Sequence, residues 1–469
     1  MNTIRILIWL ILAYYLLLHL IYLALVALGS MEARRYRKGI SFTEFRRIGE
    51  SHLTMPVSLI VPCYNEAPII GTTVRNLLRL HYPEFEIIVV SDGSTDGSVE
   101  VLTESFGLRT IERPGCRKIT SREVLAVHES ADVPRIIVAE KPNGRRGDAI
   151  NAGVALARYP LLCVIDADCI LETDTLIRLA RPFLRDKRTA AVAGVVRPSN
   201  GLLVENGAIS GRHLPRTILG INQEIEYARS FQWARIGLSR LRSMLCISGA
   251  LMLIRKSLFT ELGGCWSQAV TDDIEFTMRL NRKIHDRSNR RNERLVFAPD
   301  AVCYTEVPET ARLYASQRNR WQRGTLQALW RNRGMILNPR YGITGLVGMP
   351  FFLLFEGLAS VIELSAWILT VLALLLRIAT GAEILWMFFL AYILGIFISL
   401  CALLMTESSQ TKSVTWGDFW REIVAVMIDN LGIHQFHLIC RVVGTVEFLF
   451  GRRDLGLTMT RRESQPLPA

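Results

Sequence analysis

The sequence begins with an apolar stretch that is long enough to cross a lipid bilayer. It runs from about Ile4 to Leu28 and contains one formal charge, Arg5, near its start. A crossing needs about 20 apolar residues, whereas the apolar core of a cleaved signal peptide usually has about 7–15. We therefore expect an uncleaved transmembrane signal anchor over residues 1–30, although Ala27-Leu28-Gly29 resembles a cleavage site. By the positive-inside rule, the basic residues behind it place the following chain in the cytoplasm: Arg34, Arg35, Arg37 and Lys38.

Two further apolar regions occur much later, from Leu346 to Leu376 and from Ile384 to Met405. A short link joins them, which predicts a transmembrane hairpin over residues 346–406. Glu356 and Glu363 lie inside the first region. Because carboxylates are costly in hydrocarbon, these two lie either near a helix end or along a polar path.

The C-terminal segment from Arg421 to Phe450 is apolar but interrupted by charged residues. This pattern favours helices that lie in the membrane interface over a further crossing. The expected organisation is therefore an anchor (1–30), a cytoplasmic catalytic domain (50–311), amphipathic interfacial helices (312–345), a transmembrane hairpin (346–406), and C-terminal interfacial helices with a cytoplasmic tail (407–469).

Composition excludes several classes of protein. Half of the 469 residues are hydrophobic and 21% are charged, which excludes a disordered chain, and the length excludes a small disulfide scaffold. Nine cysteines occur without a CxxC pair, which favours a reduced, cytoplasmic domain without a zinc site. The 55 Lys and Arg residues outnumber the 43 Asp and Glu residues, which suits membrane lipid or an anionic substrate. Nucleic acid is not expected as a partner, because the basic cluster adjoins the apolar regions and no nucleic-acid motif occurs.

Between about Met55 and Pro339, short β-branched runs alternate with helical patterns. Val57–Val61, Phe85–Val90 and Leu161–Ile165 are candidate strands, and a polar cluster follows each one. Strands that alternate with helices predict an α/β fold with a mostly parallel sheet, in which ligands bind beyond the carboxyl ends of the strands. The polar clusters fall at those ends and therefore mark the expected nucleotide-binding site.

Asp166 and Asp168 follow the third candidate strand. Extended residues two apart point to the same side, so both carboxylates can face one ligand. Mg²⁺ typically takes one or two carboxylates together with substrate phosphates. The pair therefore predicts a site for a hard divalent cation, and a solvated turn with a helix cap is the alternative interpretation.

Three other polar segments have both a functional and a structural interpretation. Tyr64 and Asp92 follow neighbouring strands and could hold a nucleobase by stacking and by accepting its N–H, or Asp92 simply belongs to a turn. The basic loop from Lys141 to Asp148 leads into a helical pattern and suits phosphate, without P-loop spacing, or is merely solvated. Asp273 starts a helix, where it either takes a proton from an acceptor hydroxyl or caps the helix.

From Arg312 to Arg340 the sequence has seven arginines and no acidic residue. Arginine donates bidentately to phosphate oxygens, so this run suits a diphosphate. The simpler alternative is an amphipathic helix on anionic lipid. Trp321 and Trp330 suit a helix at the membrane interface.

Taken together and in this order, the motifs resemble the membrane-bound, inverting family 2 glycosyltransferases with a GT-A fold, which include cellulose, chitin, hyaluronan and poly-N-acetylglucosamine synthases. The resemblance runs from Val57-Ser-Leu-Ile-Val-Pro-Cys-Tyr-Asn-Glu66 through Trp321 into the hairpin. It implies an inverting hexosyltransferase that uses a UDP-sugar and Mg²⁺ or Mn²⁺ to extend a β-linked polysaccharide. It also implies a multi-pass protein of the cytoplasmic membrane whose catalytic domain faces the cytoplasm.

The resemblance assigns roles residue by residue. Asp273 takes the position of the catalytic base and Asp168 that of the metal ligand. The implied nucleotide-sugar site consists of Tyr64, Glu66, Asp92, Arg146, Asp148, Asp166 and Arg320. The implied acceptor site consists of Ser248, Gly249, Gln317 and Trp321, and the QxxRW motif supplies Gln317, Arg320 and Trp321. Three positions depart from the family pattern: Arg146 replaces a common lysine, Asp272 a common glutamate, and Cys169 leaves any third metal ligand unassigned.

Two other functions compete with a processive synthase. A nonprocessive transferase would glycosylate a membrane lipid or a short oligosaccharide, and an anchor plus a hairpin offers few helices for export without an export or accessory subunit. A catalytically inactive sensor of sugar nucleotides is disfavoured, because Asp168, Asp273 and Arg320 occur together.

Overall fold

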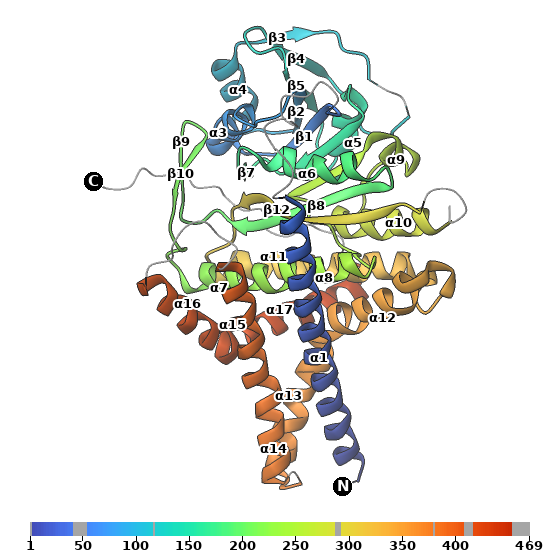
Figure 1. Ribbon diagram of the computed structural model, residues 1–469, viewed down its shortest axis with the longest axis vertical. Coiled ribbons are helices and arrows are strands. Elements are labelled where there is room, and N and C mark those ends of the chain that lie inside the picture. The colour runs from blue at the N-terminus through green and yellow to red at the C-terminus, as the bar shows by residue number, and fades with distance from the viewer. Residues whose placement is uncertain are drawn as a thin grey trace. The chain divides into compact units, whose positions relative to one another are not determined.

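The computed structural model describes residues 2–40, 54–115, 118–286, 292–378, 380–407 and 416–452 of the chain. It contains two compact units (Figure 1). The sheet unit comprises chiefly residues 38–213 and 244–307, and the helical unit comprises residues 1–37, 214–243 and 308–457. Residues 214–243 therefore pack with the helical unit, although the sequence placed them within the catalytic domain.

The sheet unit is built on a ten-stranded sheet whose strands lie in the order β3-β4-β5-β2-β1-β6-β11-β8-β12-β7. In chain order the strands are β1 (Val57–Cys63), β2 (Phe85–Asp92), β3 (Leu108–Ile111), β4 (Ala126–Ser130), β5 (Ile136–Lys141), β6 (Leu161–Ile165), β7 (Ile170–Leu171), β8 (Thr189–Pro198), β11 (Leu251–Arg255) and β12 (Arg294–Thr305). A separate antiparallel pair consists of β9 (Leu202–Glu205) and β10 (Ala208–Arg212).

The predicted parallel strands form the centre of this sheet. Strands β5, β2, β1 and β6 are parallel neighbours. Outside them the sheet is mixed, because β11 is antiparallel to both β6 and β8, and β4 is antiparallel to β3 and β5. Only residues 131–135 connect β4 to β5, which is long enough for a hairpin but too short for the crossover that a parallel pair needs. The predicted α/β fold is thus confirmed, with fewer parallel pairs than expected.

Helices cover the central strands. Every residue of β1, β2 and β6 is buried. Helix α5 packs on β1 and β2, and α6 packs on β8 and β12. Gly153 permits the close packing of α5, because a Cβ there would lie 2.6 Å from Cγ2 of Ile60. The helices of this unit are α3 (Ala67–Leu78), α4 (Ser98–Phe106), α5 (Arg146–Leu156), α6 (Thr175–Arg185), α9 (Lys256–Glu261) and α10 (Asp272–Asp286).

The helical unit contains the long N-terminal helix and the C-terminal helices. Its α-helices are α1 (Asn2–Ile40), α7 (Ile218–Glu226), α8 (Ala234–Arg240), α11 (Ala311–Arg331), α12 (Met349–Phe352), α13 (Ala359–Leu375), α14 (Gly381–Phe388), α15 (Leu394–Glu407), α16 (Trp416–Ile428) and α17 (His434–Leu449). Short π or 3-10 turns join several of them: η1 (Tyr227–Trp233), η2 (Arg333–Met335), η3 (Pro339–Tyr341), η4 (Thr344–Gly348), η5 (Leu353–Gly357), η6 (Phe389–Ile393) and η7 (Asp429–Ile433).

One helix of the described chain is long and apolar enough to cross a membrane, over Ile6–Tyr36. The pair Thr344–Gly357 and Ala359–Leu375 also meets that standard when taken together, with a bend of 50° at the break. The apolar helix Leu394–Thr406 is shorter. Helices α1, α13 and α14 run side by side in Figure 1, and Ile8, Ile11 and Leu12 of α1 pack with residues of α13 and η6 in one apolar cluster. The predicted hairpin and its orientation stay predictions.

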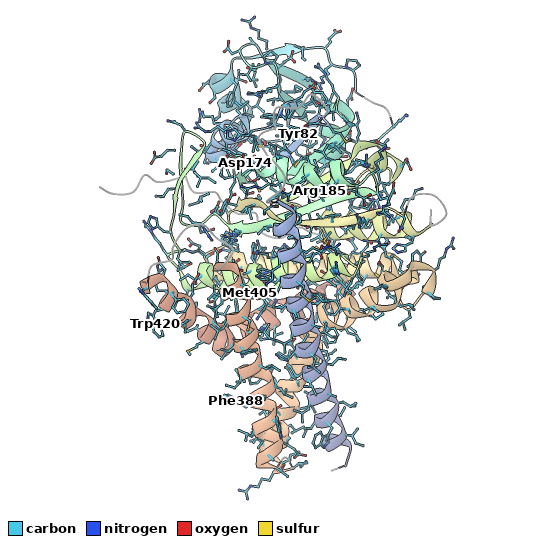
Figure 2. The ribbon with its side chains drawn as sticks, in the orientation of Figure 1. Tyr82, Asp174, Arg185, Phe388, Met405 and Trp420 are labelled. Carbon is cyan, nitrogen blue, oxygen red and sulfur yellow. The ribbon has the colours of Figure 1, made fainter. Side chains whose placement is uncertain are left out.

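Helix α16 has one apolar face exposed and one face packed inside the helical unit. Trp416, Trp420, Val424 and Met427 lie on the exposed face, at the spacing of one helix stripe. Glu422, Ala425 and Val426 lie on the buried face. Figure 2 labels Trp420, and it also labels Phe388 at the end of α14, another exposed apolar side chain. This arrangement is compatible with the interfacial helix that the sequence predicts, which stays a prediction.

Candidate active site

The structure brings ten of the predicted site residues into the sheet unit, most of them at one edge of the sheet. Strands β1, β2 and β6 end at Cys63, Asp92 and Ile165, directly before or at predicted site residues. Leu251 pairs with Ile165, and because β11 is antiparallel to β6, the segment before it ends at the same edge. That edge therefore collects the predicted residues Tyr64, Glu66, Asp92, Asp166, Asp168, Ser248 and Gly249, and Arg146, Asp148 and Asp273 start the adjoining helices α5 and α10.

The loop after β1 is held against the turn after β2. Asn65 adopts a positive φ of 56°, and its N–H donates to Oγ of Ser94 (3.1 Å). The N–H of Glu66 donates to Oγ of Ser98 (3.0 Å), and the N–H of Ala67 donates to Asp96 (2.8 Å). These bonds leave Tyr64 43% exposed beside the end of β2, where its ring is available for stacking.

Hydrogen bonds keep the carboxylate of Asp96 charged in this turn. Burial by itself would raise the pKa of Asp96. The hydroxyl of Ser98 and the N–H groups of Ala67 and Ser98 donate to the carboxylate, outweigh burial, and lower the pKa. The turn after β2 is therefore a rigid support for the Tyr64 loop.

Asp92 is buried and belongs to an ion cluster. Its register partner on β5 is Lys141, whose ammonium contacts Oδ1 of Asp92 and lies 2.7 Å from Oδ2 of Asp148. The same ammonium donates to the carbonyl of Pro142 (2.8 Å), and the N–H of Gly144 donates to Oδ1 of Asp92 (2.9 Å). The predicted nucleobase residue thus sits in an ordered cluster at the start of the basic loop.

Arg146 bridges two parts of the sheet unit that are far apart in sequence. Its Nε donates to Oδ1 of Asp166 (2.7 Å), its Nη1 contacts Asp272, and its Nη2 donates to the carbonyl of Gly249 (2.8 Å). Burial would lower the pKa of Arg146, but the carboxylates of Asp166, Asp272 and Asp273 outweigh it and raise the pKa. The carboxylate at the end of β6 is thereby linked to the start of α10.

Asp273 occupies the first turn of α10 and is held by backbone donors. Its Oδ2 accepts the N–H of Gly249 (3.1 Å), and its Oδ1 accepts the N–H of Ile274 (2.8 Å). Burial and the neighbouring charge of Asp272 raise the pKa of Asp273, and Arg146 partly opposes them. A carboxylate with a raised pKa is a better proton acceptor, which is what a general base needs.

Asp168 faces the end of β12. Its Oδ2 accepts from the hydroxyl of Thr305 (3.0 Å) and from the N–H of Glu306 (3.3 Å). Among the described residues, no group of three or more His, Cys, Asp or Glu side chains could hold a metal ion. Because Mg²⁺ and Mn²⁺ can be held by one or two carboxylates plus phosphate oxygens, Asp168 fits an ion that binds together with a diphosphate, not a preformed protein cage.

The QxxRW residues lie on α11 in the helical unit. Trp321 packs against Phe231 with ring centroids 5.8 Å apart, and the guanidinium of Arg318 lies 4.4 Å from the Trp321 ring. Gln317, Arg320 and Trp321 are each partly buried, and Oε1 of Gln317 is buried without a hydrogen-bond partner in the described chain. Their predicted roles at the diphosphate and the acceptor stay predictions.

The arginine run is less uniform than the sequence suggested. Arg318 is 1% exposed and forms a bidentate pair with Glu226 (2.6 and 2.8 Å), and Arg323 is 2% exposed and lies 3.5 Å from Glu447. These two arginines therefore stabilise the helical unit from inside. The expectation that the run faces phosphate is wrong for them, because each has an acidic partner far away in sequence.

Sequence reasoning named Lys141 only as the start of the basic loop and missed its pairing with Asp92, and it missed Thr305 and Glu306 as partners of Asp168. A basic residue at the last position of a strand was the available signal for Lys141. A pocket of about 430 Å³ lies away from these residues, at the C-terminal end of α5, where Arg113 and Arg158 help to line it. It is not part of the candidate active site.

Comparison with known families now gives this geometry its context. Residues 55–324, more than half of the chain, match the family described as glycosyltransferase like family 2. The chain belongs to this family. It is therefore a glycosyltransferase, as its motifs predicted. In addition, residues 283–439 match a family described as chitin synthase.

Curated relatives of this glycosyltransferase are polysaccharide synthases. The poly-β-1,6-N-acetyl-D-glucosamine synthase of Staphylococcus epidermidis is 26% identical over 341 residues, which cover 73% of this chain and 69% of the relative. The synthase of the same name from Staphylococcus aureus (strain COL) is 27% identical over 276 residues, covering 59% of this chain and 56% of that one.

The fold is shared with a solved glycosyltransferase. A mannosyltransferase from Pyrobaculum calidifontis, solved in complex with GDP-mannose and Mn²⁺, superposes with a TM-score of 0.51 at 15% identity. The match covers 92% of this chain and 99% of that chain. It confirms the predicted GT-A fold of the glycosyltransferase.

Proposed function

We propose that this glycosyltransferase moves a hexosyl residue from a UDP-sugar to the end of a growing β-linked polysaccharide at the cytoplasmic face of the membrane, with inversion at the anomeric carbon. The observation that carries the proposal is the bridge made by Arg146. It ties Asp166, at the end of β6, to Asp272, the neighbour of Asp273. Asp166, the carboxylate proposed to contact the nucleotide, and Asp273, the candidate base, are thus parts of one hydrogen-bonded site.

The chain's own residues supply positioning and the proton acceptor. Tyr64 stacks on the nucleobase, Asp92 accepts its N–H, and Asp166 contacts the nucleotide. The acceptor hydroxyl attacks the anomeric carbon of an α-linked donor while its proton moves to a carboxylate oxygen of Asp273. A bond forms between the acceptor oxygen and the anomeric carbon, and the bond to the diphosphate oxygen breaks with its electron pair. One displacement from the opposite face gives a β-linked product.

The raised pKa of Asp273 supports its role in this step. Burial and Asp272 favour the protonated form of the carboxyl group, so it accepts a proton more readily than an ordinary aspartate. The N–H groups of Gly249 and Ile274 fix both of its oxygens. An acceptor end that delivers its hydroxyl to Asp273 would then pass Gly249, whose N–H contacts this carboxylate, and the neighbouring Ser248.

Mg²⁺ or Mn²⁺ would be held by Asp168 together with diphosphate oxygens. When bound, such an ion offsets the negative charge that builds on the leaving diphosphate. Thr305 and the N–H of Glu306 fix the orientation of Asp168 before the nucleotide arrives. The family resemblance assigns Arg320 of the helical unit to the diphosphate, and Gln317 and Trp321 to the acceptor.

The relatives suggest the donor. Both curated relatives are named for polymers of N-acetyl-D-glucosamine. We therefore take UDP-N-acetylglucosamine as the first donor to test. We also propose that α1 crosses the membrane and keeps the enzyme beside lipid and the emerging polymer.

The test is a donor panel with the full chain in lipid nanodiscs. Radiolabelled UDP-N-acetylglucosamine, UDP-glucose and UDP-glucuronic acid are each incubated with Mg²⁺ or Mn²⁺, and the products are sized by gel filtration and extracted with organic solvent. Long polymer sensitive to a β-specific glycosidase is expected. A single labelled lipid or short oligosaccharide would favour the nonprocessive transferase, and no turnover of any UDP-sugar would contradict the proposal.

A further inference from the structure

Lys141 is a fully enclosed cation at the edge of the sheet where the nucleobase is expected. Its side chain is 0% exposed, and the side chains of its two carboxylate partners, Asp92 and Asp148, are 4% and 8% exposed. A buried lysine is retained only when it is paired, and here one ammonium is shared by two carboxylates. The cluster formally carries one net negative charge.

The ammonium has no donor left for a ligand. A lysine ammonium has three N–H donors. Oδ1 of Asp92, Oδ2 of Asp148 and the carbonyl of Pro142 account for all of them. Lys141 therefore acts on any ligand through its partners and not by direct contact.

Asp92 is the partner that can transmit this effect. Among the described residues, two donate to Asp92, the ammonium of Lys141 and the N–H of Gly144, and both hydrogen bonds end on Oδ1. No described residue donates to Oδ2 of Asp92. A carboxylate with one oxygen held by two donors cannot rotate freely, so Oδ2 is a fixed acceptor.

The loops around the cluster approach one another closely. Gly93 has a φ of +73°, and a Cβ there would lie 2.8 Å from the N atom of Asn143. A Cβ on Gly144 would lie 2.3 Å from Oδ2 of Asp148. Asp148 is held in turn by the N–H of Arg122, which lies 3.1 and 3.2 Å from its two oxygens. Both loops thus pass so close to the cluster that neither glycine can carry a side chain without a shift of its neighbours.

We propose that Lys141 is a positioning residue that sets nucleobase selection. By holding Oδ1 of Asp92, it presents Oδ2 to a base with an imide N–H, such as uracil. Cytosine offers an acceptor nitrogen at the same ring position, so two acceptors would face each other and binding would be lost. The inference rests on the proposed function, because it assumes that this edge binds a nucleotide sugar.

The test measures nucleotide binding by calorimetry, with the full chain in nanodiscs and three probes: UDP, CDP, and UDP methylated at N3 of uracil, which lacks the imide N–H. Wild type is expected to prefer UDP to the methylated analogue and to CDP by at least about tenfold, the worth of one hydrogen bond to a charged acceptor. In Lys141→Met, UDP affinity should fall by about tenfold while the affinity for the methylated analogue stays constant, so the preference disappears. Lys141→Gln, which keeps an N–H donor, should retain part of the preference.

Arg113→Met is the matched control. Arg113 is also a buried cation paired with a carboxylate of β2, Glu86 (2.8 Å), at the opposite end of the strand. Its removal should cost stability of a similar kind but leave the preference for UDP unchanged. Asp92→Asn supplies a second readout that does not alter Lys141: with its oxygen still held by Lys141, the amide NH₂ should face the base, so that the preference shifts from UDP toward CDP.

The outcomes separate this inference from the proposed function. If wild type binds none of the three nucleotides, the proposed function itself is contradicted. If wild type prefers UDP, but Lys141→Met and Lys141→Gln keep the full preference, or Arg113→Met loses it equally, the role of Lys141 is overturned and the proposed function stands. A loss confined to the Lys141 variants supports the inference.

Discussion

Replacing Arg318 by methionine tests whether the arginine run has a structural part. Arg318 is 1% exposed, donates to both oxygens of Glu226 at 2.6 and 2.8 Å, and lies over the rings of Tyr314 (4.6 Å) and Trp321 (4.4 Å). Removing one partner of a buried ion pair typically costs about 3–5 kcal/mol, because the other charge stays buried alone. The Glu226 side chain is 21% exposed, so water can reach it, and we expect the lower end, about 3 kcal/mol.

In the assay, the purified chain in mixed micelles is titrated with a denaturing detergent, and unfolding is monitored by tryptophan fluorescence. Glu226→Gln and the double variant complete a double-mutant cycle, in which the double variant should be more stable than the sum of the two single losses predicts. Arg320→Met, at a partly buried position of the same helix, should cost less stability and more transfer activity. A loss below about 1 kcal/mol for Arg318→Met, or strict additivity in the cycle, would refute the structural assignment.

Three further predictions concern the sheet unit. Because the pKa of Asp273 is raised and the base must be deprotonated, kcat/KM should rise with pH through a midpoint above that of an ordinary aspartate. Asp272→Asn removes a charge that raises this pKa and should therefore move the midpoint to lower pH. A move of the midpoint to higher pH would contradict the assignment of Asp273 as the base. Gly153→Ala should destabilise the chain in thermal unfolding, because the new Cβ would lie 2.6 Å from Ile60 and such overpacking typically costs about 1–3 kcal/mol. The control is Gly71→Ala, whose Cβ meets nothing closer than 3.6 Å. This control should be neutral or stabilising by up to about 1 kcal/mol. Mn²⁺ should bind weakly in calorimetry without nucleotide and far more tightly with UDP; tight binding of the ion alone would show a protein cage that the described residues do not form.

Local patterns in the sequence were sufficient for the centre of the fold and for the carboxylates around it. The β-branched runs predicted β1, β2 and β6, and the polar clusters after them predicted the edge where the candidate site residues gather, because both signals depend on neighbouring residues alone. The directions of the strands were harder to predict, since the apolar pattern of β11 is the same whether this strand runs parallel or antiparallel to β6. For the same reason, the sequence predicted fewer antiparallel pairs than the sheet contains.

The missed features all depend on partners that are distant in sequence. Lys141 lies 49 residues from Asp92, and their pairing follows only from the neighbouring positions of β2 and β5. Arg318 looked like one member of a uniform basic run, because Glu226 lies 92 residues away. Residues 214–243 joined the helical unit without any change in composition to mark the boundary.

The most direct test of the central claim is transfer by Asp273→Asn, compared with nucleotide binding by the same preparation. If Asp273 is the base, UDP affinity should stay within about threefold of wild type while the rate of sugar transfer falls by about 10²–10⁴, the usual contribution of a general base. Asp272→Asn, which leaves the Asp273 carboxylate in place, should keep substantially more transfer activity. Full transfer by Asp273→Asn with unchanged UDP binding would contradict the account.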